Sequence, residues 1–536
     1  MKGIILPPIS DEERTPLVEC LLDIIELLQT QVQQQGEKIQ HLEDEILVLK
    51  GEKKRPKFKP SKLDKKTDEQ KKPKDDQRPG SKKRSKKKDL KVDEDKIIQP
   101  EDIPPGSRFK GYSDFIIQEI VIKPHTVRYR LARWETPDGF TLRGKLPSNL
   151  QGHHYGVGLR AYILYQHYHC QVTQPLLQEQ LEEWGIIISS GEIDRLLSDS
   201  KDAFHQEKDA LLKTGLEVSQ YVSVDDSGAR HQGKNGYVTQ IGNELFAWFQ
   251  STYSKSRINF LELLCAGNIG YSVNTVAQSY WKKQGLSLTP TQALTSHEQV
   301  YFTATMQWEE HLDSLSINST RHRRIATEGA LLGQIMAEGA HEDLVILSDD
   351  AGQFNVLLHA LCWIHTERLI HTLVPLQDSH REDIARIRDE LWNLYRDLKS
   401  YAATKTQATP SEKDNFEKRF DALFTQKTTY ATLNQLLKRI YKNKAELLVI
   451  LDRPEVPLHT NGSESDIRDY VKKRKISGGT RSALGRRCRD TFTSLKKTCR
   501  KQGISFWKYL IDRISQDHQI PSLSDNLRQM AQAIPV

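Results

Sequence analysis

The chain has 536 residues, 37% of them hydrophobic, which is enough to build the cores of about two to four domains. It contains no apolar run of about 18 residues, no secretory signal and no Cys-x-x-Cys pair, so we expect a cytoplasmic protein without a membrane span, a disulfide framework or a cysteine-rich zinc site. Of its 78 Lys and Arg and 71 Asp and Glu, residues 51–96 hold 20 and 10, and such a concentrated basic tract is typical of proteins that bind nucleic acid.

The first unit expected from the sequence, residues 1–50, is an N-terminal coiled-coil dimerisation helix. Apolar side chains recur there at alternating steps of four and three residues, and only Gln35 interrupts them. The positions are Leu21, Ile25, Leu28, Val32, Gln35, Ile39, Leu42, Ile46 and Leu49. This pattern predicts a homodimer or a higher oligomer; the alternative is an amphipathic helix that packs on its own domain.

Two further segments separate this helix from the rest of the chain. Residues 51–100 are rich in Lys, Asp, Pro, Gly and Ser and predict a disordered basic linker. Residues 101–150 predict a small β-rich segment, because β-type runs begin at Phe115 and Thr126 and a Pro137-Asp-Gly turn follows them.

Residues 151–218 change to a helical period and predict a helix-turn-helix-like DNA-binding region. Gly185 ends one helix, and Ser189 with Glu192 has the spacing of a capping box for the next. The second helix offers only Arg195 as a strong partner for phosphate or guanine. A helical hairpin without a DNA-binding role is therefore the alternative.

The next segments predict an α/β catalytic core. A β-type run ends in Asp225 and Asp226, two more β-type runs follow, and a helical stretch covers Arg257–Leu264, which is how a ribonuclease-H-like fold begins. A continuous apolar run later leads to Asp349 and Asp350, as expected of a buried central strand. Ligands gather at strand ends in such sheets, so the acids of the two strands would meet there if the strands pair.

A third acid is expected from a helix that crosses this sheet. Asn461 can cap such a helix, which places Glu464 at its third position. Arg468, Lys472 and Lys475 follow on the same face. A carboxylate beside a basic row suits a site where a metal ion and DNA phosphates meet.

Acids at these places indicate a site for two metal ions. In-line attack on a phosphodiester needs an activated nucleophile and a stabilised leaving oxygen, and two Mg²⁺ or Mn²⁺ ions about 3.5–4 Å apart supply both. The predicted catalytic and metal-binding residues are Asp225, bridging the ions, Asp349 and Glu464. Asp226 and Asp350 are rivals, because only one residue of each neighbouring pair can face the site. Turn formation and helix capping are the alternatives for each acid taken alone.

The stretch from Arg468 to Lys501 has 13 Lys and Arg and only two acids. Its clusters, which begin at Lys472, Arg486 and Lys496, are expected along a channel where they neutralise backbone phosphates. The predicted DNA-binding residues are Arg468, Lys472, Lys473, Arg474, Lys475, Arg486, Arg487 and Arg489. The alternative is a solvated basic helix.

Together these blocks resemble the transposases of the insertion-sequence 66 family, in the Asp-Asp-Glu superfamily. The similar segments are Val224-Asp225-Asp226-Ser-Gly, Ser348-Asp349-Asp350-Ala-Gly-Gln-Phe, Cys362-Trp363-Ile-His365-Thr-Glu-Arg368, and Asn461-Gly-Ser-Glu464 with Arg468. The resemblance covers roughly residues 110–500.

The resemblance implies a ribonuclease-H-like core in two parts, residues 219–351 and 456–536, around a helical insertion over residues 352–455. It also implies a structural signature of Cys362, Trp363, His365 and Arg368. We expect Cys362 and His365 to pack the insertion against the core, since a lone Cys-x-x-His lacks two further zinc ligands. The chain departs from the family in residues 101–150, where many members carry a zinc module and this sequence has no cysteine.

The predicted function is therefore that of a DNA transposase, which cleaves and transfers the strands of a mobile element. The expected partners are double-stranded DNA at the element ends and target, a second copy of the chain, and accessory proteins of the same element, at the bacterial nucleoid. The alternatives are a catalytically inactive DNA-binding regulator and a structure-specific nuclease of the same fold.

Overall fold

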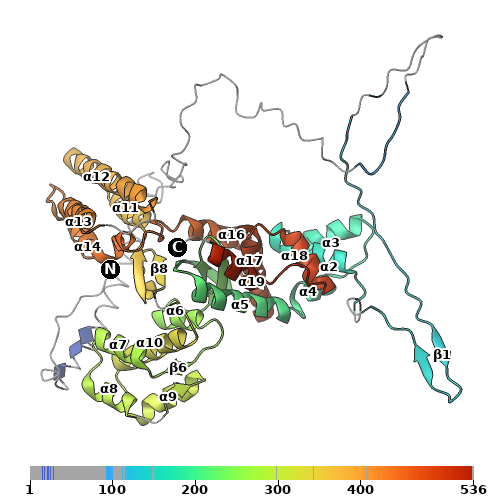
Figure 1. Cartoon of the computed structure of the whole chain (residues 1–536), viewed down its shortest axis with the longest axis horizontal. Helices are drawn as coiled ribbons and strands as arrows, with labels where there is room; N and C mark the ends of the chain where they lie inside the picture. The colour runs from blue at the N-terminus through green and yellow to red at the C-terminus, as the bar shows by residue number, and fades with distance from the viewer. Residues whose placement is uncertain are drawn as a thin grey trace, which may run out of the picture.

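A computed structural model describes residues 92–99, 112, 115–147, 150, 153–296, 299–341, 343–404 and 409–533, with a few positions between 15 and 28. The molecule is elongated, and one mixed sheet lies near its middle with helical units around it (Figure 1). This mixed sheet with many helices agrees with the α/β class expected from the sequence. Most of the predicted coiled coil and basic linker lie outside the described residues, so both stay predictions.

The central sheet has five strands in the order β5-β4-β3-β8-β9. They span Tyr221–His231 (β3), Lys234–Gly242 (β4), Ala247–Thr252 (β5), Val345–Ser348 (β8) and Leu358–Leu361 (β9). Strands β3, β4 and β5 form an antiparallel meander, whereas β8 runs parallel to both β3 and β9. Every residue of β8 is buried, as expected of a parallel strand covered on both faces.

A helical unit lies between β5 and β8 in the sequence. It comprises α6 (Arg257–Leu264), α7 (Thr275–Gln284), α8 (Leu288–Thr295), α9 (Thr305–Ser314), α10 (Thr320–Ala337), β6 (Tyr271–Ser272) and β7 (Tyr301–Phe302). The bounds of α6 are those predicted. The Trp281 indole donates to the Ala326 carbonyl at 3.1 Å, and a Cβ at Gly329 would lie 2.2 Å from that ring, so α7 and α10 pack closely.

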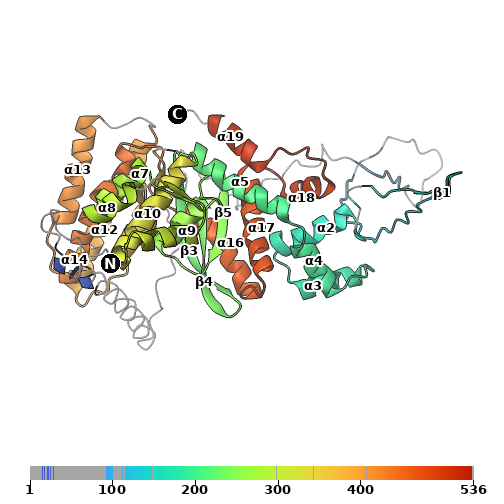
Figure 2. The ribbon, with the colours of Figure 1, turned by 90° about the horizontal axis from the view of Figure 1, so that it is seen from below.

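The edge strand β5 is covered by the long helix α17 (Ala483–Lys501) instead of by another strand (Figure 2). Side chains four residues apart on the helix accept hydrogen bonds from alternate amides of the strand. The Asp490 carboxylate accepts a hydrogen bond from the amide of Ser251 at 2.8 Å, and the Ser494 hydroxyl accepts one from the amide of Phe249 at 2.9 Å. The two repeats match, because four helical residues rise about 6 Å and two strand residues about 6.6 Å. The helix therefore satisfies an edge that could otherwise pair with another chain.

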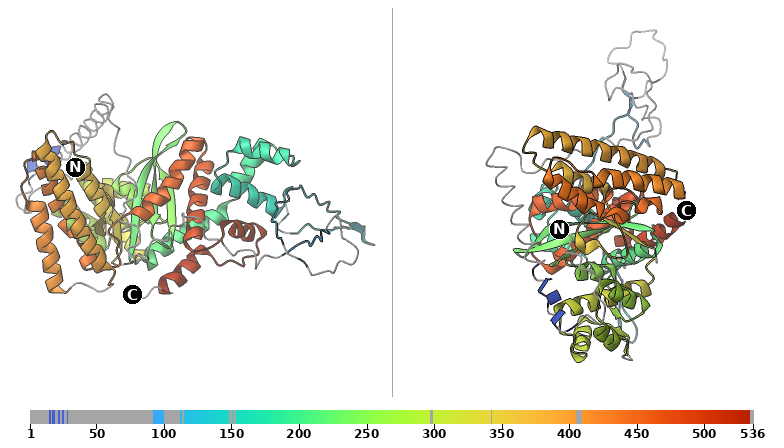
Figure 3. Two further views of the ribbon diagram at one scale, coloured as in Figure 1. Left: turned by 90° about the horizontal axis from the view of Figure 1, so that it is seen from above. Right: turned by 90° about the vertical axis from the view of Figure 1, so that its left-hand side faces the viewer.

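The helical insertion follows β9. It contains α11 (Trp363–His371), α12 (Asp378–Ala402), α13 (Pro410–Thr425), α14 (Ala431–Tyr441), α15 (Lys444–Leu447) and η6 (Val449–Leu451). Figure 3 shows its long orange helices stacked at one end of the molecule, where they enclose a hydrophobic core of their own. The predicted insertion began at residue 352, but β9 belongs to the sheet, so the helices start only at Trp363. Its four residues are too few to show a strand period.

The opposite end is formed by helices from both ends of the described chain. They are α2 (Val157–Leu164), η4 (Tyr165–His169), α3 (Gln174–Glu183), α4 (Ser190–Ser198), α5 (Asp202–Val218), α18 (Phe506–Ser515) and α19 (Leu523–Ala533). The predicted α3–turn–α4 pair is present, with Gly185 at a φ of 76° in its turn. Ser189 accepts from the amide of Glu192 at 3.2 Å, but the Glu192 carboxylate pairs with Arg195.

The segment predicted to be β-rich forms only a short hairpin, β1 (Arg133–Glu135) with β2 (Thr141–Arg143). In the described part of the segment, the run that begins at Phe115 belongs to no strand, and the run that begins at Thr126 pairs only at its end, where Arg133 and Trp134 enter β1. Their β-branched composition alone did not supply a partner strand. Among the described residues, none of the helices has both the length and the apolar character needed to cross a bilayer.

Candidate functional site

The first two predicted acids lie beside each other just beyond the segment over which β3 and β8 pair, although β3 itself continues through Asp225 to His231. Strands β3 and β8 run in parallel, with Ser223 opposite Leu347, so Asp225 and Asp349 stand at equivalent places two residues further on. Burial and the neighbouring Asp349 carboxylate raise the pKa of Asp225 to about 7, although His365 opposes this shift. The two carboxylates are therefore close enough to repel each other, which is the electrostatic condition that a bound cation relieves.

The third predicted acid lies on the same face of the sheet. Helix α16 (Asn461–Ser477) packs on the face formed by Val238, Ala247 and Phe249, and strand register places Asp225 on this face. Next to Glu464, the Ser463 hydroxyl lies 2.5 Å from that of Ser223. The helix begins one residue earlier than predicted, with Thr460 rather than Asn461 at its N-cap, and the Thr460 side chain accepts no capping hydrogen bond.

Two side chains of α11 hold Glu464. Arg368 approaches both of its carboxylate oxygens, at 2.9 and 3.2 Å, and His365 Nε2 lies 3.5 Å from Oε1. Burial alone would lower the pKa of His365, but the Cys362 side chain and, further away, Asp349 raise it to about 9. The Arg368 guanidinium also lies 3.1 Å from His365 Nε2, so these two side chains and Glu464 form one connected cluster.

The rival acids have other partners. Asp226 faces the opposite side of the sheet with Val224 and accepts a hydrogen bond from Gln353 at 2.9 Å. Asp350 forms an ion pair with Arg439 of α14 and thereby ties the insertion to the loop after β8. These contacts give both rivals a structural task and leave Asp225 and Asp349 facing α16.

The donor set suits a hard divalent cation, because it consists of carboxylate oxygens, two of which belong to mutually repelling groups. Glu464 Oε1 is buried and accepts no hydrogen bond of good geometry, although Arg368 is near. Within the described part of the chain, however, no three acidic, imidazole or thiol groups stand where they could hold a metal ion together. The reason is visible at Glu464, whose carboxylate is turned toward Arg368.

The predicted DNA-binding residues divide into three groups by exposure. Arg468, Lys472, Lys475 and Arg487 are exposed to solvent. Arg474, Arg486 and Arg489 are half-buried and contact the Gly228 carbonyl, the Tyr253 ring and the Gly478 carbonyl, respectively. Lys473 is buried, donates to the carbonyl of His167 at 3.0 Å, and has a pKa lowered to about 7 by burial and by Arg489 and Lys496. Lys473 thus faces the interior rather than a phosphate.

Lysines of the basic cluster that begins at Lys496 face the acids of another helix. Lys497 is buried and lies 2.9 Å from Asp469, and Lys501 lies 2.8 Å from Asp466. Both acids belong to α16, so these lysines join α17 to α16. The sequence interpretation took them as phosphate contacts because it counted only the charges between Arg468 and Lys501.

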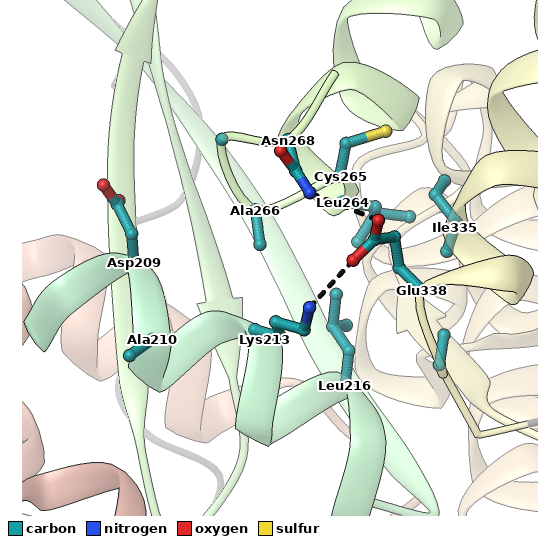
Figure 4. Close-up of a pocket in the computed structure, with 12 residues that line it drawn as sticks. Asp209, Ala210, Lys213, Leu216, Leu264, Cys265, Ala266, Asn268, Ile335 and Glu338 are labelled. Atoms are coloured by element: carbon teal, nitrogen blue, oxygen red, sulfur yellow. Dashed lines mark hydrogen bonds and ion pairs between the residues drawn. The ribbon is translucent and has the colours of Figure 1, made fainter. Parts of the chain in front are cut away.

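A cavity of about 300 Å³ lies elsewhere, between α5 and the helices α6 and α10 (Figure 4). Its wall includes Leu216 and Ala340, which precede β3 and β8, so it is at the opposite ends of these strands from Asp225. Lys213 and Glu338 form a 2.8 Å ion pair across it. The cavity contributes nothing to the acidic site.

The sequence interpretation gave His365 and Arg368 only a structural task. Trp363 has such a task, since its indole donates to the Leu447 carbonyl at 2.9 Å and the ring is fully buried. His365 and Arg368, three residues apart on α11, instead contact Glu464. Their common helix face, distinct from that of Trp363, was the available signal in the sequence.

The fold and the site together define an α/β protein with an acid within β3 and another directly after β8, near a helix with exposed basic side chains. Residues 294–487 match the family described as "Transposase IS66 family". The chain is also 42% identical over 311 residues to an uncharacterised protein, y4jO, of Sinorhizobium fredii (strain NBRC 101917 / NGR234); the match covers 58% of this chain and 96% of that relative. The chain belongs to the IS66 transposase family.

Proposed function

We propose that this protein is a DNA transposase that cleaves strands at the ends of a mobile element and joins them to target DNA, using divalent metal ions. The observation that supports the proposal is that His365, which interacts electrostatically with Asp225 and Asp349, also lies 3.5 Å from Glu464 of α16. Transposases of the Asp-Asp-Glu kind generally use a divalent metal. Two Mg²⁺ or Mn²⁺ ions would supply an activated nucleophile and a stabilised leaving oxygen at this place.

The topology supports a ribonuclease-H-like core. An antiparallel meander of three strands is followed by two parallel strands on the side of β3, and the first acid lies on β3 itself. The second acid follows the neighbouring strand β8, and the third lies on a helix after the insertion.

The DNA backbone would run along the outer face of α16. Arg468, Lys472 and Lys475 follow Glu464 on this helix and are exposed, and Arg487 at the start of α17 is exposed as well. Each can neutralise a phosphate next to the acids. Self-association through residues 17–50 would bring two such sites to the two ends of an element, in the bacterial cytoplasm.

A cleavage assay on DNA that carries the element ends tests the proposal. With Mg²⁺ or Mn²⁺ the wild-type chain is expected to nick and join this DNA, and Asp225→Asn is expected to lose the activity while it still binds. Asp226→Asn is the matched control, because it changes the neighbouring carboxylate on the other face. DNA binding without cleavage by the wild type would favour an inactive regulator instead. Equal loss in both variants would contradict the assignment of Asp225.

A further inference from the structure

The hairpin of β1 and β2 projects outward at the end of the molecule that holds α2, α3 and α4 (Figure 1). Its turn is closed by the hydrogen bonds of Thr136 with Phe140 and Gly139, and Gly139 has a φ of 80°, which glycine adopts without strain. The strands are only three residues long. An isolated two-stranded hairpin is marginally stable in water. We therefore infer its binding partner from the side chains on its two faces.

One face of this hairpin carries two arginines directly opposite each other. Arg133 pairs in register with Arg143, and both are exposed. Side chains in such pairs have their Cβ atoms about 4.5–5.5 Å apart, and like charges there destabilise the hairpin. Within the part of the chain that the structure describes, neither arginine has an ion-pair partner. A polyanion that lies across both guanidinium groups would turn this repulsion into binding.

The other face carries apolar side chains. Trp134 lies opposite Leu142, and they are 72% and 58% exposed. The surroundings are basic as well, since residues 115–147 contain six Lys and Arg against three Asp and Glu. A basic ribbon with an exposed aromatic side chain is complementary in charge to nucleic acid. It would repel a second copy of this chain, which is itself rich in Lys and Arg.

We propose that the Arg133–Arg143 hairpin binds the backbone of duplex DNA as a two-stranded ribbon, a partner class that rests on the proposed function. The major groove of B-DNA is wide enough for such a ribbon. The two arginines donate to phosphate oxygens, so this contact positions the protein on the duplex without itself reading its sequence.

The position of the hairpin fits this role. Before it in the chain, Pro124 Cγ lies 3.8 Å from the place of a Cβ on Gly185, in the turn between α3 and α4. The chain that leads into the hairpin thus passes the helix pair predicted from the sequence to bind DNA, and the hairpin projects from the same end of the molecule (Figure 1). It is far from the helical insertion at the other end of the molecule (Figures 1 and 3).

One substitution separates binding from folding, because the two effects have opposite signs. Arg143→Glu places an acid opposite Arg133, which stabilises the hairpin, but it removes one phosphate contact and adds a repelling charge. In the full-length protein we expect at least about 10-fold weaker binding to a fluorescein-labelled duplex, with a log–log salt slope shallower by about one to two. Arg143→Lys should bind nearly as the wild type does. Hydrogen exchange of residues 131–145 should not become faster in Arg143→Glu.

The matched control is Arg381→Glu, the same charge change at an exposed position of α12. It should change duplex affinity by less than about twofold. Wild-type affinity in Arg143→Glu, or weaker binding together with faster exchange of the hairpin, would overturn the proposal. So would an altered oligomeric state at unchanged duplex affinity, which would identify a second copy of the chain as the partner. If the wild-type chain itself bound no duplex, the proposed function would fail together with this one.

Discussion

Helices α16 and α17 have similar basic sequences but use their charges in different ways. On α16, Arg468, Lys472 and Lys475 are exposed beside Glu464. On α17, Lys496 and Lys497 are buried and face the acids of α16. These three cations of α16 point outward, where a phosphate can reach them, whereas these two lysines of α17 point inward, where they neutralise carboxylates.

The acids of the two helices differ in the same manner. Glu464 is part of the candidate site, and its partners Arg368 and His365 come from another unit of the fold. Asp490 of α17 is fully buried and accepts hydrogen bonds from the amide and hydroxyl of Ser251 and from the Tyr470 hydroxyl. Charge density along a sequence therefore does not distinguish a catalytic helix from a structural one; the partners of each charge do.

The largest expected effect is on strand cleavage, and it distinguishes Glu464 from Asp490. Glu464→Gln should lower strand cleavage by about 10³-fold, since it removes a charge at the reacting centre, and leave the free energy of unfolding nearly unchanged. The measurements are a cleavage rate at saturating Mg²⁺ and a urea denaturation curve.

Asp490→Asn is the companion variant, and it should lower stability while leaving cleavage nearly unchanged. The substitution perturbs three buried hydrogen bonds that hold β5 to α17 and α16 and should destabilise the fold by about 2–3 kcal/mol. Cleavage by its folded fraction should stay near that of the wild type. If Asp490→Asn abolished cleavage without a change in stability, the division between the two helices would be wrong.

The next effect concerns the inward-facing lysines. Lys497→Met should destabilise the fold by about 3 kcal/mol, because it leaves Asp469 and Asp466 with fewer counter-charges in the interior. The cost is at the low end for a buried pair, since Lys496 and Lys501 remain near the same acids. Urea denaturation measures it. An unchanged midpoint together with weaker DNA binding would show that Lys497 serves the phosphates after all.

The difference between the two helices shows which features of the fold could be predicted from the sequence and which could not. The bounds of α6 were predictable because its signals are local, and Ser256 caps it by accepting from the Asn259 amide. The acids Asp225 and Asp349 were predictable for a similar reason, as each ends an apolar run. The partners of Lys497 were not, since Asp469 lies on a separate helix and only tertiary packing brings the two together.

The role of His365 shows the same limit within the candidate site. Its neighbourhood combines α11, which follows β9, with α16, which begins almost 100 residues later in the sequence. A Cys-x-x-His pattern indicated packing, and Cys362 is indeed buried. The contact of His365 with Glu464 depends on how the insertion returns to the sheet, which no local pattern contains.

A smaller effect concerns the outward-facing lysines. Lys472→Met should leave stability within about 0.5 kcal/mol of the wild type. This lysine is 61% exposed, and its ion pair with Asp469 is long, at 3.7 Å. It should reduce the log–log salt slope of DNA binding by about one, as expected for one lost phosphate contact. Fluorescence anisotropy over a salt series measures this, with Lys497→Met as the partner variant whose slope should stay unchanged.

A last comparison tests Lys473, which lies on α16 but faces the interior like Lys496 and Lys497 of α17. Burial and the cations Arg489 and Lys496 lower its pKa from 10.5 to about 7 in the folded protein. Between these values the unfolded chain holds a proton that the folded chain lacks, so this group makes stability rise with pH from about 7 to about 10.5, by at most about 1.4 kcal/mol per pH unit.

Lys473→Met should therefore be more stable than the wild type near neutral pH, and the difference between the two should shrink as the pH rises toward about 10. Denaturation midpoints of both proteins across this range isolate the effect, because all other lysines titrate in both. A difference that is independent of pH would mean that Lys473 keeps its proton inside the fold. In that case its ammonium group would have to be reassigned from the interior to the exposed, phosphate-facing row of α16.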